Sequence, residues 1–237
     1  MPPFSLADIL APLWFIACWF GYGQFADYKR GRPGSLMARM HEYRVLWMRR
    51  MLERENRILD SQIVTTLMGS VSFFASTTLF IIAGLIAVFG AREQVLGLLG
   101  ELPFAIDSSP VLWNLKLSLL VVLFVYAFFK FTWALRHFNY CAIVLGAAPL
   151  PGQLDADASR FAERAARMAS SAASHFNAGL RAYYFGLAAL SWFVHPWLFM
   201  AATAWVVLVI YRREFRSRLL RTLSAVDEGP PGRPPSP

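Results

Sequence analysis

Long runs of apolar residues alternate with polar, basic segments along the 237-residue chain. The apolar runs lie at approximately residues 4–24, 62–89, 111–135 and 182–211. An α-helix needs about 20 predominantly apolar residues to cross a hydrocarbon core about 30 Å thick, and each run reaches roughly that length. The pattern therefore predicts an all-α, polytopic integral membrane protein folded as a helical bundle.

The last apolar run contains no Asp, Glu, Lys or Arg, and Pro196 divides it. As one helix it would be about 45 Å long, and fitting a core of about 30 Å by tilt alone would require nearly 50°. Pro196 lacks a backbone N–H and disfavours helix at His195 before it. We therefore expect a turn at His195–Pro196, with spans at about 175–195 and 196–211. One kinked helix is the alternative.

Basic residues are concentrated in alternate loops. Residues 26–61 contain nine Lys or Arg and five acids, whereas residues 90–110 contain one Arg and three acids. Residues 136–181 contain five Arg, and the segment "YRREFRSRLLR" after the last run adds five more. Loops rich in Lys and Arg stay in the cytoplasm. This rule predicts about five spans, with the N-terminus outside and the C-terminus cytoplasmic, or four spans if the last run is one helix.

The basic loops also have helical patterns of their own. Apolar residues recur at helical spacing over about 36–60, which predicts an amphipathic helix at the cytoplasmic membrane interface. The segment "ASRFAERAARMASSAASHF" predicts a second cytoplasmic helix, capped by Asp155 or Asp157, that can continue into the fourth span. We expect residues 1–221 to form a single membrane domain. Residues 222–237 have a Pro- and Gly-rich composition typical of disorder.

Composition supports the membrane class and excludes others. Hydrophobic residues make up 57% of the chain and charged residues only 16%, against about 25% charged in soluble domains. The net charge of +8 does not indicate nucleic-acid binding, because the basic residues gather at the ends of the apolar runs. The N-terminus lacks a charged start and a small-residue cleavage site, so we expect the first helix to be retained. Arg outnumbers Lys 20 to 3, which indicates a GC-rich bacterial source and its inner (plasma) membrane.

Four ionisable residues lie within or beside the predicted spans. Lys116 and Lys130 are fourteen residues apart on the third span, about 21 Å along a helix. Asp8 shares the outer side with Lys116, and Asp27 shares the inner side with Lys130. We expect two ion pairs that join the first span to the third, or simple snorkelling of the lysines, with a transport role as the alternative.

The second span is rich in small and hydroxylated residues. Gly69, Ser72, Ser76 and Ala83 share one helical face. Small residues let membrane helices approach closely, and hydroxyls bond across the contact. We therefore expect this face to pack against another helix, with a polar pore lining as the alternative.

Signatures of enzymes and metal sites are missing from the sequence. The histidines His41, His137, His175 and His195 have no Cys, His or acidic neighbour at a metal-binding spacing, although the first three could gather at the cytoplasmic face. No HExxH, GxSxG, P-loop or Rossmann glycine pattern occurs. We expect no enzymatic activity, no cofactor and no metal, with a lipid-processing enzyme as the remote alternative.

Several short motifs occur in an order and spacing that resemble a known family. They are "YRVLWMRRM" followed by the Ser/Thr-rich span, "FTWALRHFNY", "NAGLRAYYF", and the Pro-containing break at 195–196. Over roughly residues 5–215 the chain resembles the membrane family catalogued as domain of unknown function 599. The resemblance implies a multispanning membrane protein without an assigned activity. Within its motifs, the candidate site residues are Arg44, Trp47, Arg136, Asn177, Gly179, Arg181 and Tyr184.

Most of these candidates fall at the cytoplasmic side of the predicted topology. We therefore expect them to form a shared inner-face site for anionic lipid of the cytoplasmic leaflet or for a protein partner. The function favoured by the sequence is a non-enzymatic accessory or interaction subunit, with a partner protein or a homo-oligomer as its assembly. A small oligomeric transporter or channel, with Lys116, Lys130 and the hydroxylated face lining its pathway, is the alternative.

Overall fold

The computed structural model describes residues 6–29, 34–91, 109–151 and 157–216, with residues 220, 222 and 223. In this part of the chain the fold is all-α, as the sequence predicts, and contains six α-helices. They are α1 Leu6–Lys29, α2 Leu36–Leu52, α3 Ile58–Gly90, α5 Pro110–Gly146, α6 Ala158–Leu190 and α7 Pro196–Phe215. A short 3₁₀ turn, η2 Ser191–Phe193, follows α6.

Three helices are long and apolar enough to cross a membrane. The apolar stretches are Leu6–Ala26 in α1, Ile58–Gly90 in α3 and Pro110–Gly146 in α5. α5 has 37 residues, which is about 55 Å of helix and nearly twice the thickness of a hydrocarbon core. α3 and α6, with 33 residues each, are also longer than a span requires.

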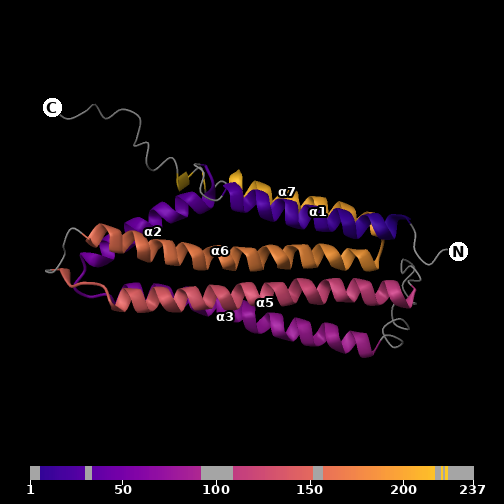
Figure 1. The fold of residues 1–237 in the computed structure, drawn as a ribbon, viewed down its shortest axis with the longest axis horizontal. Helices are drawn as coiled ribbons and strands as arrows, with labels where there is room; N and C mark the ends of the chain where they lie inside the picture. The colour runs from indigo at the N-terminus through magenta and orange to yellow at the C-terminus, as the bar shows by residue number, and fades with distance from the viewer. Residues whose placement is uncertain are drawn as a thin grey trace.

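The long helices lie side by side (Figure 1). α5 packs between α3 and α6, while α1 pairs with α7 on the other side of α6. α2 packs against the N-terminal half of α6. At that end α3, α5 and α6 extend past α1 and α7, and α2 covers the extension (Figure 1).

The chain forms two helices around His195–Pro196, not one bent helix. α6 ends at Leu190, and His195 has an extended backbone with φ −160° and ψ 138°. Its imidazole Nδ1 accepts a hydrogen bond from the Trp197 backbone N–H at 3.2 Å, and Pro196 is the first residue of α7. Because an N-cap residue satisfies an otherwise unpaired helix N–H, this arrangement starts a new helix. The chain reverses here, and α7 returns along α6 (Figure 1).

The interfacial helix expected over residues 36–60 is shorter in the structure. α2 ends at Leu52, and α3 begins at Ile58 after a turn. Within α3, the fully buried Asp60 carboxylate accepts hydrogen bonds from the Trp47 indole N–H and from the Arg54 guanidinium, both at 2.6 Å. These contacts hold the start of α3 against α2, so the chain turns instead of continuing as one helix.

Two separate cores support the fold. The first, which we call the α1–α7 half, joins α1, α5, α6 and α7 around aromatic side chains such as Phe15, Phe185, Trp192 and Phe199. The second, which we call the α2 lobe, joins α2 to the ends of α3, α5 and α6 around Met48 and Met51. A third cluster, around Phe131, connects them.

The prediction that one face of the second span packs against another helix is wrong within this chain. Gly69, Ser72, Ser76 and Ala83 are all exposed. The buried side of α3 instead consists of Asp60, Val64, Val71, Ala75 and Thr78. Hydroxyls at Thr65, Thr66, Ser70 and Thr77 bond to carbonyls four residues earlier in the same helix, which satisfies them without a partner helix.

Candidate functional site at the α2–α6–α7 junction

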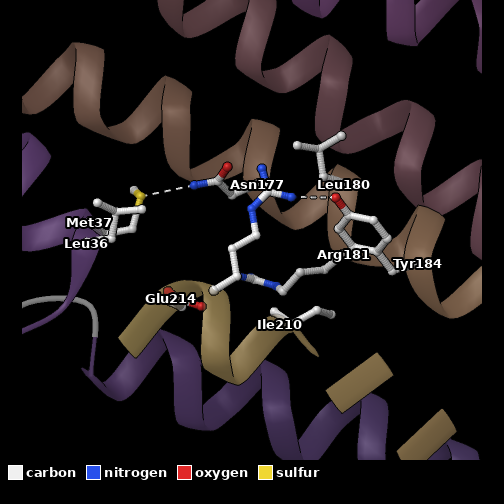
Figure 2. A pocket seen from close by; sticks show the side chains of 9 residues that line it. Leu36, Met37, Asn177, Leu180, Arg181, Tyr184, Ile210 and Glu214 are labelled. Carbon is white, nitrogen blue, oxygen red and sulfur yellow. Dashed lines mark hydrogen bonds between the residues drawn. The ribbon is translucent and has the colours of Figure 1, made fainter. Parts of the chain in front are cut away.

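A pocket lies where the start of α2 meets α6 and the end of α7 (Figure 2). Its volume is about 140 Å³. It is lined by Leu36, Met37, Asn177, Leu180, Arg181, Tyr184, Ile210, Arg213 and Glu214. Three of the sequence candidates, Asn177, Arg181 and Tyr184, therefore meet here, one turn apart on α6. We call it the junction pocket.

Hydrogen bonds tie the three helices together around the junction pocket. The Asn177 amide donates to the Met37 sulfur at 3.0 Å, and the Arg213 guanidinium donates to the Tyr184 hydroxyl at 2.7 Å (Figure 2). Glu214 accepts from the Tyr22 hydroxyl of α1 at 3.0 Å. The pocket thus presents two cationic side chains with one carboxylate, and its donors suit a small anionic group.

A larger groove lies on the other side of Arg181, between α1, α5 and α6. Its volume is about 680 Å³, within the range of roughly 300–1,000 Å³ typical of small-molecule sites. Trp19 of α1 and Tyr126 of α5 meet edge to face, with ring centroids 5.3 Å apart. The Lys130 ammonium lies 5.2 Å from the centre of the Tyr126 ring. We call this opening the lateral groove.

Two histidine rings contact each other beside the lateral groove. The rings of His137 and His175 have centroids 4.9 Å apart, and His175 lines the groove. His137 Nδ1 lies 2.8 Å from the Trp133 carbonyl. His41 lies instead in the α2 lobe, where its Nδ1 is 2.8 Å from the Ser170 hydroxyl. Among the described residues, no group of three or more His, Cys, Asp or Glu side chains could hold a metal ion.

Arg44 belongs to the α2 lobe and not to the junction pocket. It is half-buried, and its guanidinium donates to the Ser170 hydroxyl at 3.4 Å. Burial lowers the pKa of Arg44 from its usual range because desolvation penalises the charged form. Arg44 therefore shares a partner with His41 and connects α2 to α6.

Trp47 has a structural partner that the sequence analysis missed. Its indole N–H donates to Asp60, which also pairs with Arg54. The Asp60 side chain is 0% exposed, whereas that of Arg54 is 36% exposed. A buried charge requires a paired, hydrogen-bonded environment. The sequence feature that could have indicated this contact is Asp60 itself, an acid at the edge of a long apolar run and thirteen residues after Trp47.

Arg136 lies apart from the other candidates, on the exposed surface of α5. Its guanidinium donates to the Tyr140 hydroxyl at 2.6 Å and lies 5.6 Å from the ring centres of both Trp133 and Tyr140. These contacts follow the helical spacing of three and four residues. The single shared site expected from the sequence is therefore divided among the junction pocket, the α2 lobe and the outer face of α5.

The ionisable residues expected within or beside the spans do not share one environment. The Lys116 side chain is buried, with its ammonium 5.7 Å from the ring centres of both Trp192 and Phe193. Asp8, in the first turn of α1, interacts electrostatically with Lys116. Lys130 lines the lateral groove. The side chain of Asp27 lies outside the described residues.

The fold identifies the class of protein to which the chain belongs. The three candidate membrane-spanning helices indicate an α-helical membrane protein. Residues 10–219 match the family described as "Protein of unknown function, DUF599", and the chain belongs to it. No curated protein and no solved structure shows significant similarity to the chain.

Proposed function

We propose that the protein is a five-span bacterial inner-membrane protein, with its N-terminus outside and its C-terminus in the cytoplasm. The spans are α1, the C-terminal part of α3, the N-terminal part of α5, the C-terminal half of α6, and α7. The distribution of charge on α6 supports a span that covers only the C-terminal half of this helix. Arg160, Arg164 and Arg167 are exposed on its first half, whereas Leu187 and Leu190 are exposed on its second half. Charged side chains suit water and exposed leucines suit lipid.

Within that topology, we propose a non-enzymatic interaction subunit that contacts its partner at the cytoplasmic end. The observation that carries the proposal is the junction pocket, where Asn177, Arg181 and Arg213 converge from two helices. Arg is enriched at interfaces because its planar guanidinium binds carboxylates with two donors. An acidic side chain or the C-terminal carboxylate of a partner protein fits a pocket of about 140 Å³ with these donors.

The arrangement gives less support to a transporter. The features expected to line a pathway do not share one cavity in the described part of the chain. Lys116 is buried between aromatic rings, Lys130 lines the lateral groove, and the hydroxylated face of α3 points away from the other helices.

Topology can be tested with reporter fusions. A reporter after residue 221 is expected to be cytoplasmic, as is one inserted after residue 151, between α5 and α6. A reporter inserted after residue 91, at the end of α3, is expected on the opposite side. An extracytoplasmic signal after residue 221 would contradict the five-span proposal.

The interaction role can be tested by purifying the full chain gently with its native lipids and analysing it by native mass spectrometry. We expect a protein partner at fixed stoichiometry, reduced at least about tenfold by Arg213→Ala, which changes the junction pocket and not the lateral groove. Truncating one partner of a buried, hydrogen-bonded charge pair commonly costs about 2–5 kcal/mol. Arg160→Ala, which removes an 80% exposed cation of the α2 lobe, is the matched control. Equal retention of the partner by both variants would exclude the junction pocket as the contact.

A further inference from the structure

We propose that the lateral groove binds one anionic phospholipid of the cytoplasmic leaflet, with its phosphate at Lys130, His175 and Arg181 and an acyl chain along α1 and α5. The inference goes beyond the junction pocket, and it rests on the membrane placement proposed above. The groove opens between α1, α5 and α6, whereas the junction pocket opens between α2, α6 and α7, and Arg181 lines both.

The two ends of the groove differ in chemistry. One end is apolar, with Ile16, Phe20, Leu119 and Val122 in its walls. Phe20 is 60% exposed and Val122 is 58% exposed, so the apolar wall reaches the surface of the bundle. In a bilayer this surface faces acyl chains, which can enter the groove without crossing water.

The opposite end of the groove is cationic. Lys130 comes from α5, and His175 and Arg181 come from α6. The Lys130 ammonium contacts the Tyr126 ring, and no carboxylate of the described residues forms an ion pair with it. Basic pockets between membrane helices on the cytoplasmic side are suited to anionic lipid headgroups.

The length of the groove also matches one leaflet. Leu119 and Lys130, at its apolar and cationic ends, are eleven residues apart on α5, which is about 16 Å of helix. Half of a hydrocarbon core about 30 Å thick is about 15 Å. A lipid whose phosphate lies at Lys130 would therefore extend its acyl chain to Leu119, near the middle of the bilayer.

The experiment is native mass spectrometry of the purified full chain with phosphatidylglycerol or with phosphatidylcholine of the same acyl chains. We expect one phosphatidylglycerol to be retained in preference to phosphatidylcholine. Lys130→Gln should lower that retention about fivefold, since one basic residue near an anionic lipid has an effect of this size. Arg136→Gln, which removes an exposed cation of α5 outside the groove, should leave it unchanged.

A second pair of variants tests the apolar end and does not depend on a charge. Val122→Trp fills the groove and should exclude the lipid, whereas Leu187→Trp, at a residue of α6 that is 61% exposed and outside the groove, should not. Equal retention of the two lipids by the wild type would overturn the proposal, as would equal losses within either pair of variants. Displacement of the lipid by inorganic phosphate would show a site for a soluble anion instead. Because these measurements need no partner protein, their failure leaves the interaction role standing, and the reporter fusions test the topology separately.

Discussion

The α1–α7 half and the α2 lobe share two helices but are built from different side chains. In the α1–α7 half, large rings fill the core: Phe199 stacks on Trp192 with ring centroids 5.1 Å apart, and Phe15 packs against Phe199 at the same distance. In the α2 lobe, Met48 and Met51 of α2 pack on a stripe of buried alanines of α6. These alanines are Ala162, Ala165, Ala166 and Ala169. Their small side chains let α2 approach α6 closely.

If the proposed topology holds, the difference between the two regions is that of one helix, α6, placed partly in water and partly in lipid. A lobe placed in water is stabilised by burying apolar surface, so α6 can expose Arg160 and Arg164 there and bury its alanine stripe. In lipid, no hydrophobic gain accompanies helix contact, and shape complementarity of large side chains must hold the bundle. In the proposed topology, the change from exposed arginines to exposed leucines along α6 is the transition between the two environments.

The largest expected effect is that of Asp60→Ala, which should destabilise the α2 lobe and leave the α1–α7 half folded. Asp60→Ala leaves the Arg54 guanidinium and the Trp47 indole without their buried acceptor. We expect the free energy of unfolding to fall by about 3 kcal/mol. This value is at the lower end of the range for breaking a buried ion pair, because Arg54 is partly exposed. Hydrogen exchange measured by mass spectrometry should show lost protection throughout α2.

The matched variant for this prediction is Asp60→Asn. It keeps an oxygen that can accept from Trp47 and removes the charge that pairs with Arg54, so the expected loss is about 1–2 kcal/mol. α1 and α7 should keep their protection in both variants, because local opening is confined to cooperative units. A uniform increase of exchange across all helices would show that the two cores are not separate units.

An intermediate effect is expected at Gly179, on the face of α6 that meets the middle of α5. A Cβ at Gly179 would lie 2.5 Å from Cε1 of Phe131, whose ring is fully buried. Gly179→Ala should therefore cost about 1–3 kcal/mol by overpacking and lower the thermal midpoint of the purified protein. In the control Gly69→Ala, the added Cβ meets nothing within 4 Å. If both variants were equally stable, close contact between α5 and α6 would not be what connects the two cores.

Sequence periodicity was sufficient for the all-α class and for the turn at His195–Pro196, but not for the end of α2 or for the contacts between helices. The apolar runs predicted the all-α class, and Pro196 predicted a break where α7 now begins. The pattern could not tell lipid-facing from protein-facing sides of α3, because both are apolar in a membrane. Gly69 and Ser76 therefore suggested a packing face, although the structure exposes them.

The candidate site was also predictable only in part, because spacing along one helix can be read from the sequence and contacts between helices cannot. Asn177, Arg181 and Tyr184 are spaced by three or four residues, so helical geometry alone places them on one side of α6. Arg44, Trp47 and Arg136 belong to other helices, and their positions depend on long-range packing that spacing does not encode. Arg136 lies on the outer surface of α5, and Trp47 points to Asp60.

The smallest expected effect compares two similar helix caps in the two regions. The Ser35 hydroxyl accepts from the Ala38 N–H at 3.1 Å at the start of α2, and the Ser109 hydroxyl accepts from the Leu112 N–H at 3.3 Å at the start of α5. Ser35→Ala should cost about 1 kcal/mol, the usual effect of removing a cap. Ser109→Ala should cost less, because Pro110 already fixes the first helical residue.

Both variants can be compared by thermal unfolding and by hydrogen exchange at the first turn of each helix. A larger loss at Ser35 would show that the lobe, whose helix α2 has only 17 residues, depends more on local capping than a long apolar helix does. The physical reason is that a short helix has few other interactions to fix its first turn. A larger loss at Ser109 would reverse the comparison and place the weaker helix start in the α1–α7 half.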